Sequence, residues 1–377
     1  MDKSSTAAIR QLYSAGKFSE AAQAQVAHIN SLPVEQKVDR ASALVFMGAI
    51  LFALGDFKGL MSATGAAVQL DPGNASHWEN HGVALGRCHL SAEARDAFLK
   101  ALELGQKTPN VYDGLANCYG RLRDLDNARK YGNAALMAKD AASAHNRIDD
   151  LQKKPVPAFN HNPRRQKNII AYSIWGDNPR YTRTGLDNIE AAKYLFPAWT
   201  CRFYVDESVP ADIRKALADA GGQVKMMSRN QQYEGLFWRF LVASDPEVEF
   251  FLCRDADSLL STKERVAVDE WLASGLPFHV MRDFYTHTDL MLAGMWGGVA
   301  GILPDIEKLI ASYKPPHLTT RNVDQWFLRD MVWPRIRDKT CIHDSLYDVP
   351  GTRRFPAVGG LPPDRHVGQN HSVHVKE

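Results

Sequence analysis

The sequence predicts two domains of different fold class: an α-helical repeat solenoid and, after it, an α/β domain with a mostly parallel, Rossmann-like sheet. The chain has 377 residues, more than one domain usually contains. Its first part is rich in Ala and Leu, and similar residues recur there with a period of about 34 residues. Its second part alternates short apolar segments with helical ones, as parallel sheets do. We expect the repeat domain at residues 1–152, a linker at 153–167 and the α/β domain at 168–377.

Composition and charge exclude several classes of protein. Apolar residues make up 45% and charged residues 23% of the chain, values typical of a globular protein. The formal net charge of +2 gives no overall attraction for nucleic acid, so we expect no nucleic-acid partner. The longest nearly apolar stretch, residues 41–54, is shorter than the roughly 20 residues that cross a bilayer, and the N-terminus shows no signal-peptide pattern. We therefore expect no transmembrane segment.

The five cysteines point to a reducing compartment. They are odd in number and form no CxxC pair, which argues against a disulfide framework and against a zinc ribbon. We therefore expect a cytoplasmic protein.

Large and small residues recur at the same six positions of three successive repeats. In the central repeat these are Trp78, Gly82, Leu85, Ala94, Phe98 and Ala101; one period later they are Tyr112, Ala116, Tyr119, Ala128, Gly132 and Ala135, and one period earlier Leu44, Gly48, Leu51, Leu60, Thr64 and Ala67. An irregular copy around Gly16 and Phe18 precedes them. The pattern resembles the tetratricopeptide repeat, in which pairs of antiparallel helices bury their apolar stripes by stacking on their neighbours. That resemblance implies a concave surface for a peptide or protein partner; the alternatives are a helical spacer and a dimerisation element that forms a homodimer.

The segment between the two domains reads KKPVPAFNHNPRRQK. Its three prolines cannot continue a helix, so the helical stack should end here. We expect an extended, solvated linker, with contact to phosphate as the alternative for its basic residues.

Short apolar runs after the linker predict strands at residues 168–175, 201–205, 223–227 and 249–253. Helical patterns lie between them at residues 184–196, 211–220 and 236–243. Ligands of such sheets bind beyond the carboxyl ends of the strands, so the polar residues that follow each strand are the candidates for a site.

Two carboxylates follow the fourth predicted strand directly. Asp255 and Asp257 are separated by one residue, and an extended chain places them on the same side. Two like charges there are costly unless a cation lies near them, and carboxylate oxygens favour Mg²⁺ or Mn²⁺. The alternative is a capped turn between strand and helix, because Ser261 and Glu264 form a capping-box pattern.

In this context residues 168–343 resemble the GT-A class of nucleotide-sugar glycosyltransferases. The aromatic-Arg segment 237–240 precedes the Asp-x-Asp motif, and the segments 293–298, 324–328 and 343–345 follow it in a similar order. The resemblance implies transfer of a sugar from a UDP- or GDP-sugar to a protein or glycan acceptor with the help of Mn²⁺ or Mg²⁺. It also implies that Asp257 contacts the metal, that Asp255 contacts the metal or the ribose, and that His343 supplies a third ligand; a structural histidine is the alternative for His343.

Several further residues are candidates for binding the nucleotide. Arginine forks match phosphate oxygens, so Arg239, Arg254 and Arg282 are candidates for the diphosphate, with ordinary ion pairs as the alternative. Tyr172, Trp175 and Asp177 end the first strand, where a nucleobase could stack or accept hydrogen bonds; core packing is the alternative for the two aromatic residues.

The general base has two candidates. Asp283 follows an apolar run that should be a strand, and Asp324 begins a helical segment in which it could instead be an N-cap. The sequence does not choose between inverting and retaining transfer.

The glycine-rich segment 294–298 lacks the dinucleotide and P-loop fingerprints and predicts close approach of the backbone to a sugar or to a neighbouring strand. We expect His366, His371 and His374 to be exposed in a polar tail.

Two other functions fit parts of the sequence. An apolar strand followed by Asp-x-Asp also opens the site of haloacid-dehalogenase-like phosphatases, where Asp255 would be the nucleophile. The chain could also be a non-catalytic repeat scaffold with a degenerate transferase domain. Phosphatase activity lost in Asp255→Asn would favour the first of these.

Overall fold

The computed structural model describes residues 3–144, 146–162, 166–228, 234–315, 322–358 and 365–371. The chain divides into two compact units, Met1–Ala138 and Lys139–Glu377, which we call the repeat domain and the sheet domain. This division precedes the boundary expected at residue 152. The reason is that Lys139 and Asp140 are held by side chains of the sheet domain. Lys139 Nζ lies 2.9 Å from Asp289 Oδ1, and Trp333 Nε1 donates to Asp140 Oδ1 at 2.9 Å.

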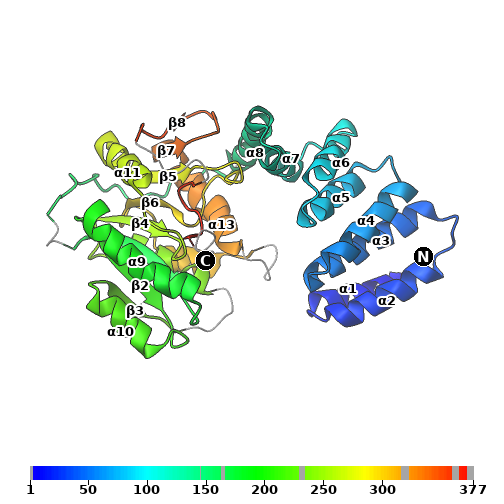
Figure 1. Ribbon diagram of the computed structural model, residues 1–377, viewed down its shortest axis with the longest axis horizontal. Helices are drawn as coiled ribbons and strands as arrows, with labels where there is room; N and C mark the ends of the chain where they lie inside the picture. The colour runs from blue at the N-terminus through cyan, green and yellow to red at the C-terminus, as the bar shows by residue number, and fades with distance from the viewer. Residues whose placement is uncertain are drawn as a thin grey trace. The chain divides into compact units, whose positions relative to one another are not determined.

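The repeat domain is built of consecutive helices in antiparallel pairs (Figure 1). They are α1 (Lys3–Ser14), α2 (Phe18–Ser31), α3 (Lys37–Leu54), α4 (Phe57–Leu70), α5 (Ala75–Arg87), α6 (Ser91–Glu103), α7 (Pro109–Arg121) and α8 (Leu125–Ala144). The pairs α3–α4, α5–α6 and α7–α8 are the three expected repeats, and α1–α2 is the irregular one. Asp56 and Thr108 cap α4 and α7 by accepting bonds from Gly59 N and Val111 N.

The alternation of large and small residues has a direct packing reason. A Cβ added at Gly82 would lie 2.9 Å from the ring of Phe98, and one added at Gly114 would lie 2.4 Å from it. The Phe98 ring therefore fills space that two glycines leave between neighbouring helices. Thr64, which replaces an aromatic residue in the repeat pattern, is buried and donates its hydroxyl to Leu60 O at 2.9 Å.

The sheet domain contains an eight-stranded sheet of order β3-β2-β1-β4-β6-β5-β7-β8. Its strands are β1 (Asn168–Ile174), β2 (Thr200–Val205), β3 (Gln223–Met226), β4 (Phe250–Arg254), β5 (Phe278–Arg282), β6 (Met295–Val299), β7 (Thr340–Asp344) and β8 (Thr352–Arg353). Strand β6 runs antiparallel to β4 and β5, and the remaining pairs are parallel. The sheet is therefore mixed, but most of its strand pairs are parallel, as expected.

The helices of the sheet domain are α9 (Pro179–Leu195), α10 (Ala211–Asp219), α11 (Thr262–Ser274), α12 (Ile306–Ser312), α13 (Val323–Phe327) and α14 (Trp333–Ile336). The helix expected at 236–243 is instead two short 3₁₀ segments, Glu234–Leu236 and Trp238–Ser244. No helix among the described residues is long and apolar enough to cross a membrane.

The centre of the sheet is closely packed. β1 and β4 are buried along their whole length, which explains their continuous apolar sequences. A Cβ added at Gly297 would lie 2.4 Å from Phe251 O, and one added at Gly298 would lie 2.6 Å from the Phe278 ring. The expected close approach of the glycine-rich segment to a neighbouring strand is therefore confirmed for these two residues.

The predicted linker is irregular, and its described residues are exposed or half-buried. Residues 146–162 form neither helix nor strand, but they pack on the sheet domain. Gln152 N donates to Ile302 O at 2.8 Å, and Lys154 Nζ donates to Ala300 O at 2.8 Å. The ring of Phe159 lies 5.6 Å from Trp199 and 5.4 Å from Phe250, between centroids. Contact with these aromatic rings removes apolar surface from water and holds the segment in place.

Candidate functional site

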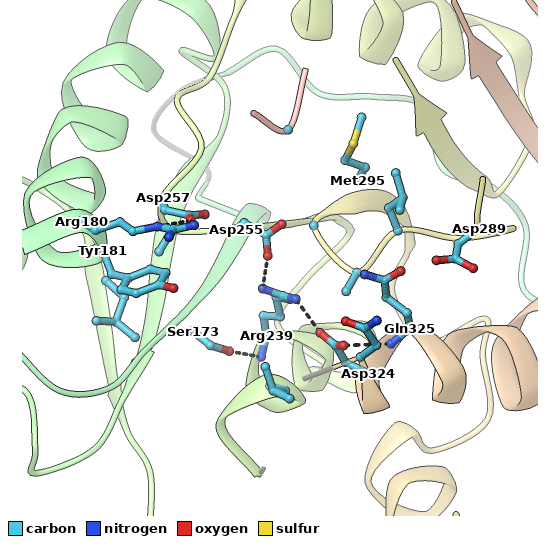
Figure 2. Close-up of a pocket in the computed structure, with 18 of the residues that line it drawn as sticks. Ser173, Arg180, Tyr181, Arg239, Asp255, Asp257, Asp289, Met295, Asp324 and Gln325 are labelled. Atoms are coloured by element: carbon cyan, nitrogen blue, oxygen red, sulfur yellow. Dashed lines mark hydrogen bonds and ion pairs between the residues drawn. The ribbon is translucent and has the colours of Figure 1, made fainter. Parts of the chain in front are cut away.

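One cavity lies at a switch point of the sheet. The chain runs outward from β1 to β2 and β3, and then returns to β4 on the other side of β1. The carboxyl ends of β1 and β4 thus flank the point where strand order reverses, the usual ligand position in such sheets. A cavity of about 1080 Å³ opens there, and Figure 2 shows many of its residues. Residues from the ends of β1 and β4, the start of α9, the segment between β5 and β6, and α13 line it.

The two carboxylates of the Asp-x-Asp motif both line this cavity. The side chain of Asp257 is 12% exposed and accepts a bond from Arg180 Nε at 2.7 Å, with Nη2 as a second donor. The side chain of Asp255 is 42% exposed and accepts a bond from Arg239 Nη1 at 2.7 Å. Burial and the nearby charge of Asp255 raise the pKa of Asp257, and Arg180 acts against that rise. The motif is therefore a crowded pair of anions.

Arg239 joins this motif to Asp324. Its Nη2 donates to Asp324 Oδ2 at 3.0 Å, and its backbone N–H donates to Ser173 Oγ at 3.0 Å (Figure 2). Arg239 and Asp324 are both buried. Burial, and to a smaller extent the charge of Asp255, raise the pKa of Asp324 to about 6 although Arg239 acts in the opposite direction. Asp324 lies in the first turn of α13, whose N-cap is Asn322, and its Oδ1 accepts from Gln325 N at 2.9 Å.

Gly294 is required by the position of Asp255. A Cβ added at Gly294 would lie 2.2 Å from Asp255 Oδ2 and 2.9 Å from Asp255 N. Because β6 is antiparallel to β4, its first residues lie beside the end of β4. The glycine thus lets the segment before β6 pass the carboxylate.

The candidates for the nucleobase are divided between cavity and core. Trp175 lines the cavity and packs edge to face on Trp238, with ring centroids 6.3 Å apart. Tyr172 is fully buried and stacks on Phe203 with centroids 5.0 Å apart, so core packing accounts for it. Asp177 is exposed and is not among the cavity-lining residues. Of this group, only Trp175 is placed to contact a ligand of the cavity.

Two of the three candidate arginines do not reach the cavity. Arg254 is buried, pairs with Glu264, and donates to Trp296 O at 3.0 Å. Arg282 is 1% exposed and donates its Nε to Asp344 Oδ2 at 2.7 Å. Their guanidinium groups are committed to partners inside the domain, which corrects the expectation that they bind diphosphate. Arg239 alone of the three lines the cavity.

Arg254 also explains why the capping box is incomplete. Ser261 Oγ accepts from Glu264 N at 3.3 Å and so caps α11 as expected. The Glu264 carboxylate accepts a bond from the Arg254 guanidinium, whereas in a complete capping box it would accept from the backbone N–H of the N-cap residue.

Asp283 and His343 lie outside the cavity. The Asp283 carboxylate is held by Lys263 and Ser345, and it accepts from Val367 N at 2.7 Å. His343 lies on β7 beside His279, with Nδ1 2.8 Å from His279 Nε2. The structure therefore does not bring His343 together with Asp255 and Asp257, and it gives Asp283 a packing role.

The histidines near the C-terminus are less exposed than expected. His366 and His371 are half-buried: His366 stacks on Phe284 with centroids 4.1 Å apart, and His371 N donates to Asp257 O at 2.7 Å. His374 lies outside the described residues.

Sequence reasoning missed the start of α9. Helix α9 begins at Pro179, ahead of the helix expected at 184–196, and this brings Arg180 and Tyr181 into the cavity. Asn178 caps the helix by accepting from Arg180 N at 3.0 Å. An Asn-Pro pair directly after a strand is a helix-start signal that would have identified both residues.

The segment between β5 and β6 was also missed. Its His287 and Asp289 line the cavity. Burial lowers the pKa of His287 to about 3, so this imidazole is neutral at physiological pH.

Comparison with known proteins gives matches to parts of the chain. No family model matches it. A curated protein of Arabidopsis thaliana, the inactive TPR repeat-containing thioredoxin TTL3, is 27% identical over 120 residues; these are 32% of this chain, which spans 17% of that protein. Among solved structures, MamA covers 38% of this chain and 78% of its own with 19% identity and a TM-score of 0.33. An O-GlcNAc transferase mutant of Thermobaculum terrenum covers 60% of this chain and 42% of its own with 19% identity and a TM-score of 0.33. The helix pairs and the repeat-containing relative together make the N-terminal region tetratricopeptide-like.

Proposed function

We propose that this protein is a metal-dependent glycosyltransferase of the GT-A type that moves a sugar from a UDP- or GDP-sugar to a protein or glycan acceptor. The observation that carries the proposal is the position of Asp255 and Asp257. Both stand at the carboxyl end of β4, at the switch point of the sheet, and line one cavity together with the buried Asp324. A cavity of about 1080 Å³ is large enough for a ligand of nucleotide-sugar size.

The residues of the motif fit a hard divalent cation. Asp255 and Asp257 offer only carboxylate oxygens. Burial first, and then the charge of Asp255, raise the pKa of Asp257, and a bound cation would offset both effects. We propose that these two aspartates hold Mn²⁺ or Mg²⁺, with water and phosphate as its other ligands. The bound ion would neutralise charge on the diphosphate leaving group. His343 takes no part in this set.

Arg180 is the residue that we assign to the diphosphate. Its side chain is 41% exposed and belongs to the first turn of α9, where the helix end also favours an anion. It now neutralises Asp257. When a cation takes that place, the guanidinium is free to turn towards the phosphate oxygens, which it can bind with two parallel bonds.

Asp324 is the residue that we assign to proton transfer. A carboxyl with a pKa of about 6 is ionised at neutral pH and holds a proton better than an ordinary aspartate does, as a general base must. Its hydrogen bond to Arg239 fixes the orientation of the carboxylate towards the cavity.

The test is binding of nucleotides in the presence of metal. The full chain is titrated with UDP-, GDP- and CMP-sugars in the presence and absence of Mn²⁺, and transfer and hydrolysis are followed in parallel. We expect one nucleotide class to bind only with the metal, and Asp257→Asn to abolish this binding. Asp219→Asn, an exposed carboxylate on α10 of the same domain, is the matched control. Absence of metal-dependent binding for every donor would refute the proposal.

The two alternatives receive less support from the cavity. A phosphatase of the haloacid-dehalogenase type would need a lysine beside the aspartate nucleophile, and no described residue that lines the cavity is a lysine. In a non-catalytic scaffold the cavity would bind no nucleotide. Metal-dependent binding in the same titration would therefore exclude the scaffold, and absence of binding would favour it.

We propose further that the repeat domain binds the acceptor or a partner protein. It has its own cavity of about 310 Å³ between α2, α3 and α4, lined mainly by apolar side chains such as Val26, Leu44 and Met47. An apolar hollow on a helical repeat surface fits an apolar side chain of a bound segment. Ala63→Glu would place a charge in this cavity, and we expect it to reduce transfer to the acceptor while donor hydrolysis is unchanged.

A further inference from the structure

Three side chains that can bind metal lie together away from the cavity. They are His279 on β5 and Cys341 and His343 on β7, and all are buried. The parallel pairing of β5 and β7 places His279 opposite Cys341, and His343 follows two residues later on the same face of the sheet. Their ligand atoms lie within 4.8 Å of one another. This cluster shares no residue with the cavity that contains Asp255 and Asp257.

We propose that His279, Cys341 and His343 form a binding site for a divalent transition-metal ion, Zn²⁺ by its chemistry. One thiolate and two imidazoles are the ligand set that this borderline-soft ion prefers over Mg²⁺ or Mn²⁺. The set has one cysteine and thus none of the CxxC spacing by which zinc ribbons are detected.

The distances are close to those that zinc requires. In a tetrahedral site two nitrogens lie about 3.3 Å apart and a nitrogen and a sulfur about 3.6 Å apart, since Zn–N bonds are about 2.0–2.1 Å and Zn–S bonds about 2.3 Å long. Here His279 Nε2 and His343 Nδ1 are 2.8 Å apart, and Cys341 Sγ lies 3.9 Å from His343 Nδ1. The third pair of ligand atoms, on His279 and Cys341, lies within 4.8 Å. Shifts of at most about 1 Å would therefore bring the three atoms around one ion.

The surroundings orient the ligands as metal sites do. His343 Nε2, on the ring edge away from the cluster, lies 3.4 Å from Glu270 Oε2. The other oxygen of Glu270 accepts from Arg353 Nη1 at 3.0 Å. A carboxylate beside the outer nitrogen favours the tautomer with its proton on Nε2, in which Nδ1 presents its lone pair to the cluster. The ring of His279 is held by stacking on Trp271, with centroids 5.3 Å apart.

The competing account is a hydrogen-bonded relay without metal. In it His279 and His343 share one hydrogen bond, and the Glu270 carboxylate lies beside His343 Nε2. Cys341 then remains a thiol, because burial raises its pKa to about 11. Metal binding instead requires the thiolate. The ionisation state of Cys341 in the presence of metal therefore separates the two accounts.

The experiment uses Co²⁺ as a spectroscopic substitute for Zn²⁺ in the full chain. Metal content is measured on the protein as purified, the metal is removed with a chelator, and Co²⁺ is added back. We expect one equivalent of Co²⁺ to produce the thiolate-to-cobalt charge-transfer absorption, Zn²⁺ to abolish it by displacement, and the metal to raise the melting temperature. Glu270→Gln should weaken the affinity by about 10- to 100-fold while the absorption persists at saturation.

The matched variants are Cys341→Ser and Cys201→Ser. Cys201 is another buried cysteine of the same sheet, on β2, so its replacement should leave the absorption intact. Cys341→Ser should abolish it, and Asp257→Asn should not affect it, since carboxylates give no such absorption. Absence of the thiolate-to-cobalt absorption in the wild-type chain, or an absorption that persists in Cys341→Ser, would overturn the proposal in favour of the relay. If Cys341→Ser does not fold, the wild-type titration and Glu270→Gln decide the question.

Discussion

The bridge formed by Arg239 makes a prediction about stability that depends on pH. Replacing Arg239 by Met removes the guanidinium that pairs with Asp255 and Asp324 but keeps much of the side-chain volume. Asp324 is 5% exposed at its side chain and loses its only ion pair that the described residues show. A buried carboxylate without a partner is the costly product of this change, so Arg239→Met should destabilise the sheet domain strongly wherever Asp324 is ionised.

The magnitude follows from the pKa of Asp324. In the folded protein the pKa is about 6, against an ordinary value of 3.8, so folding favours the protonated form. The Asp324 carboxylate therefore lowers the free energy of unfolding as pH rises from about 4 to about 6, by about 3 kcal/mol in total, and has no further effect above that range. At pH 8 Arg239→Met should cost about 3–5 kcal/mol, the usual effect of breaking a buried pair. At pH 5 Asp324 is mostly protonated, and the cost should fall to about 1–2 kcal/mol for lost hydrogen bonds.

Urea unfolding followed by tryptophan fluorescence measures these values. Seven of the eight tryptophans belong to the sheet domain, because Trp78 alone lies before residue 139. Arg183→Met, which changes an exposed arginine on α9, is the control and should lie within about 0.5 kcal/mol of the wild type at both pH values.

The double variant Arg239→Met/Asp324→Asn tests the cause. It removes the unpaired charge, so we expect it to recover most of the stability that Arg239→Met loses at pH 8. Equal destabilisation of Arg239→Met at pH 5 and pH 8, or no recovery in the double variant, would show that the pairing with Asp324 is not what holds Arg239 in place.

Three other predictions test the site and the repeats. Gly294→Ala puts a Cβ 2.2 Å from Asp255 Oδ2 and should weaken metal-dependent nucleotide binding by about tenfold or more in calorimetry; unchanged binding would remove Asp255 from the site. Arg180→Ala should strengthen Mn²⁺ binding several-fold, since about one competing charge is lost, but weaken nucleotide binding; a change of both in the same direction would contradict the role assigned to Arg180. Gly114→Ala, with its Cβ 2.4 Å from Phe98, should destabilise the repeat domain by about 1–3 kcal/mol in circular dichroism, whereas Gly86→Ala, with nothing within 4 Å, should be neutral or slightly stabilising.

Local sequence patterns predicted the parts of the fold that local forces determine. The regular repeat identified the helix pairs because each pair buries the same face, and the apolar runs identified β1, β2, β3 and β4. Asp255 and Asp257 were found because a buried strand ends directly before them. The run 236–243 was misassigned because a short apolar segment has no period long enough to separate a helix from other compact turns.

The remaining errors come from pairing over long distances in the sequence. Arg282 and Asp344 are 62 residues apart and meet only because β5 and β7 are neighbours. The same pairing draws His343 towards His279 and away from the Asp-x-Asp motif. Strand β6 lies between β4 and β5 and is antiparallel to both, and its sequence does not indicate that direction. The position of each buried partner therefore depends on topology that a single sequence does not reveal.

The segment at residues 146–162 determines how this chain can be divided for experiments. Phe159 covers the rings of Trp199 and Phe250, and Gln152 and Lys154 bond to the backbone at Ile302 and Ala300. A shortened protein that begins at residue 168, where the first strand starts, would leave these rings uncovered and these bonds unmade. Such a fragment should aggregate, whereas one that begins before Lys139 keeps the contacts. A fragment designed to contain the sheet domain should therefore begin ahead of Lys139. This boundary precedes both the first strand and the proline-rich segment that was predicted to be a linker.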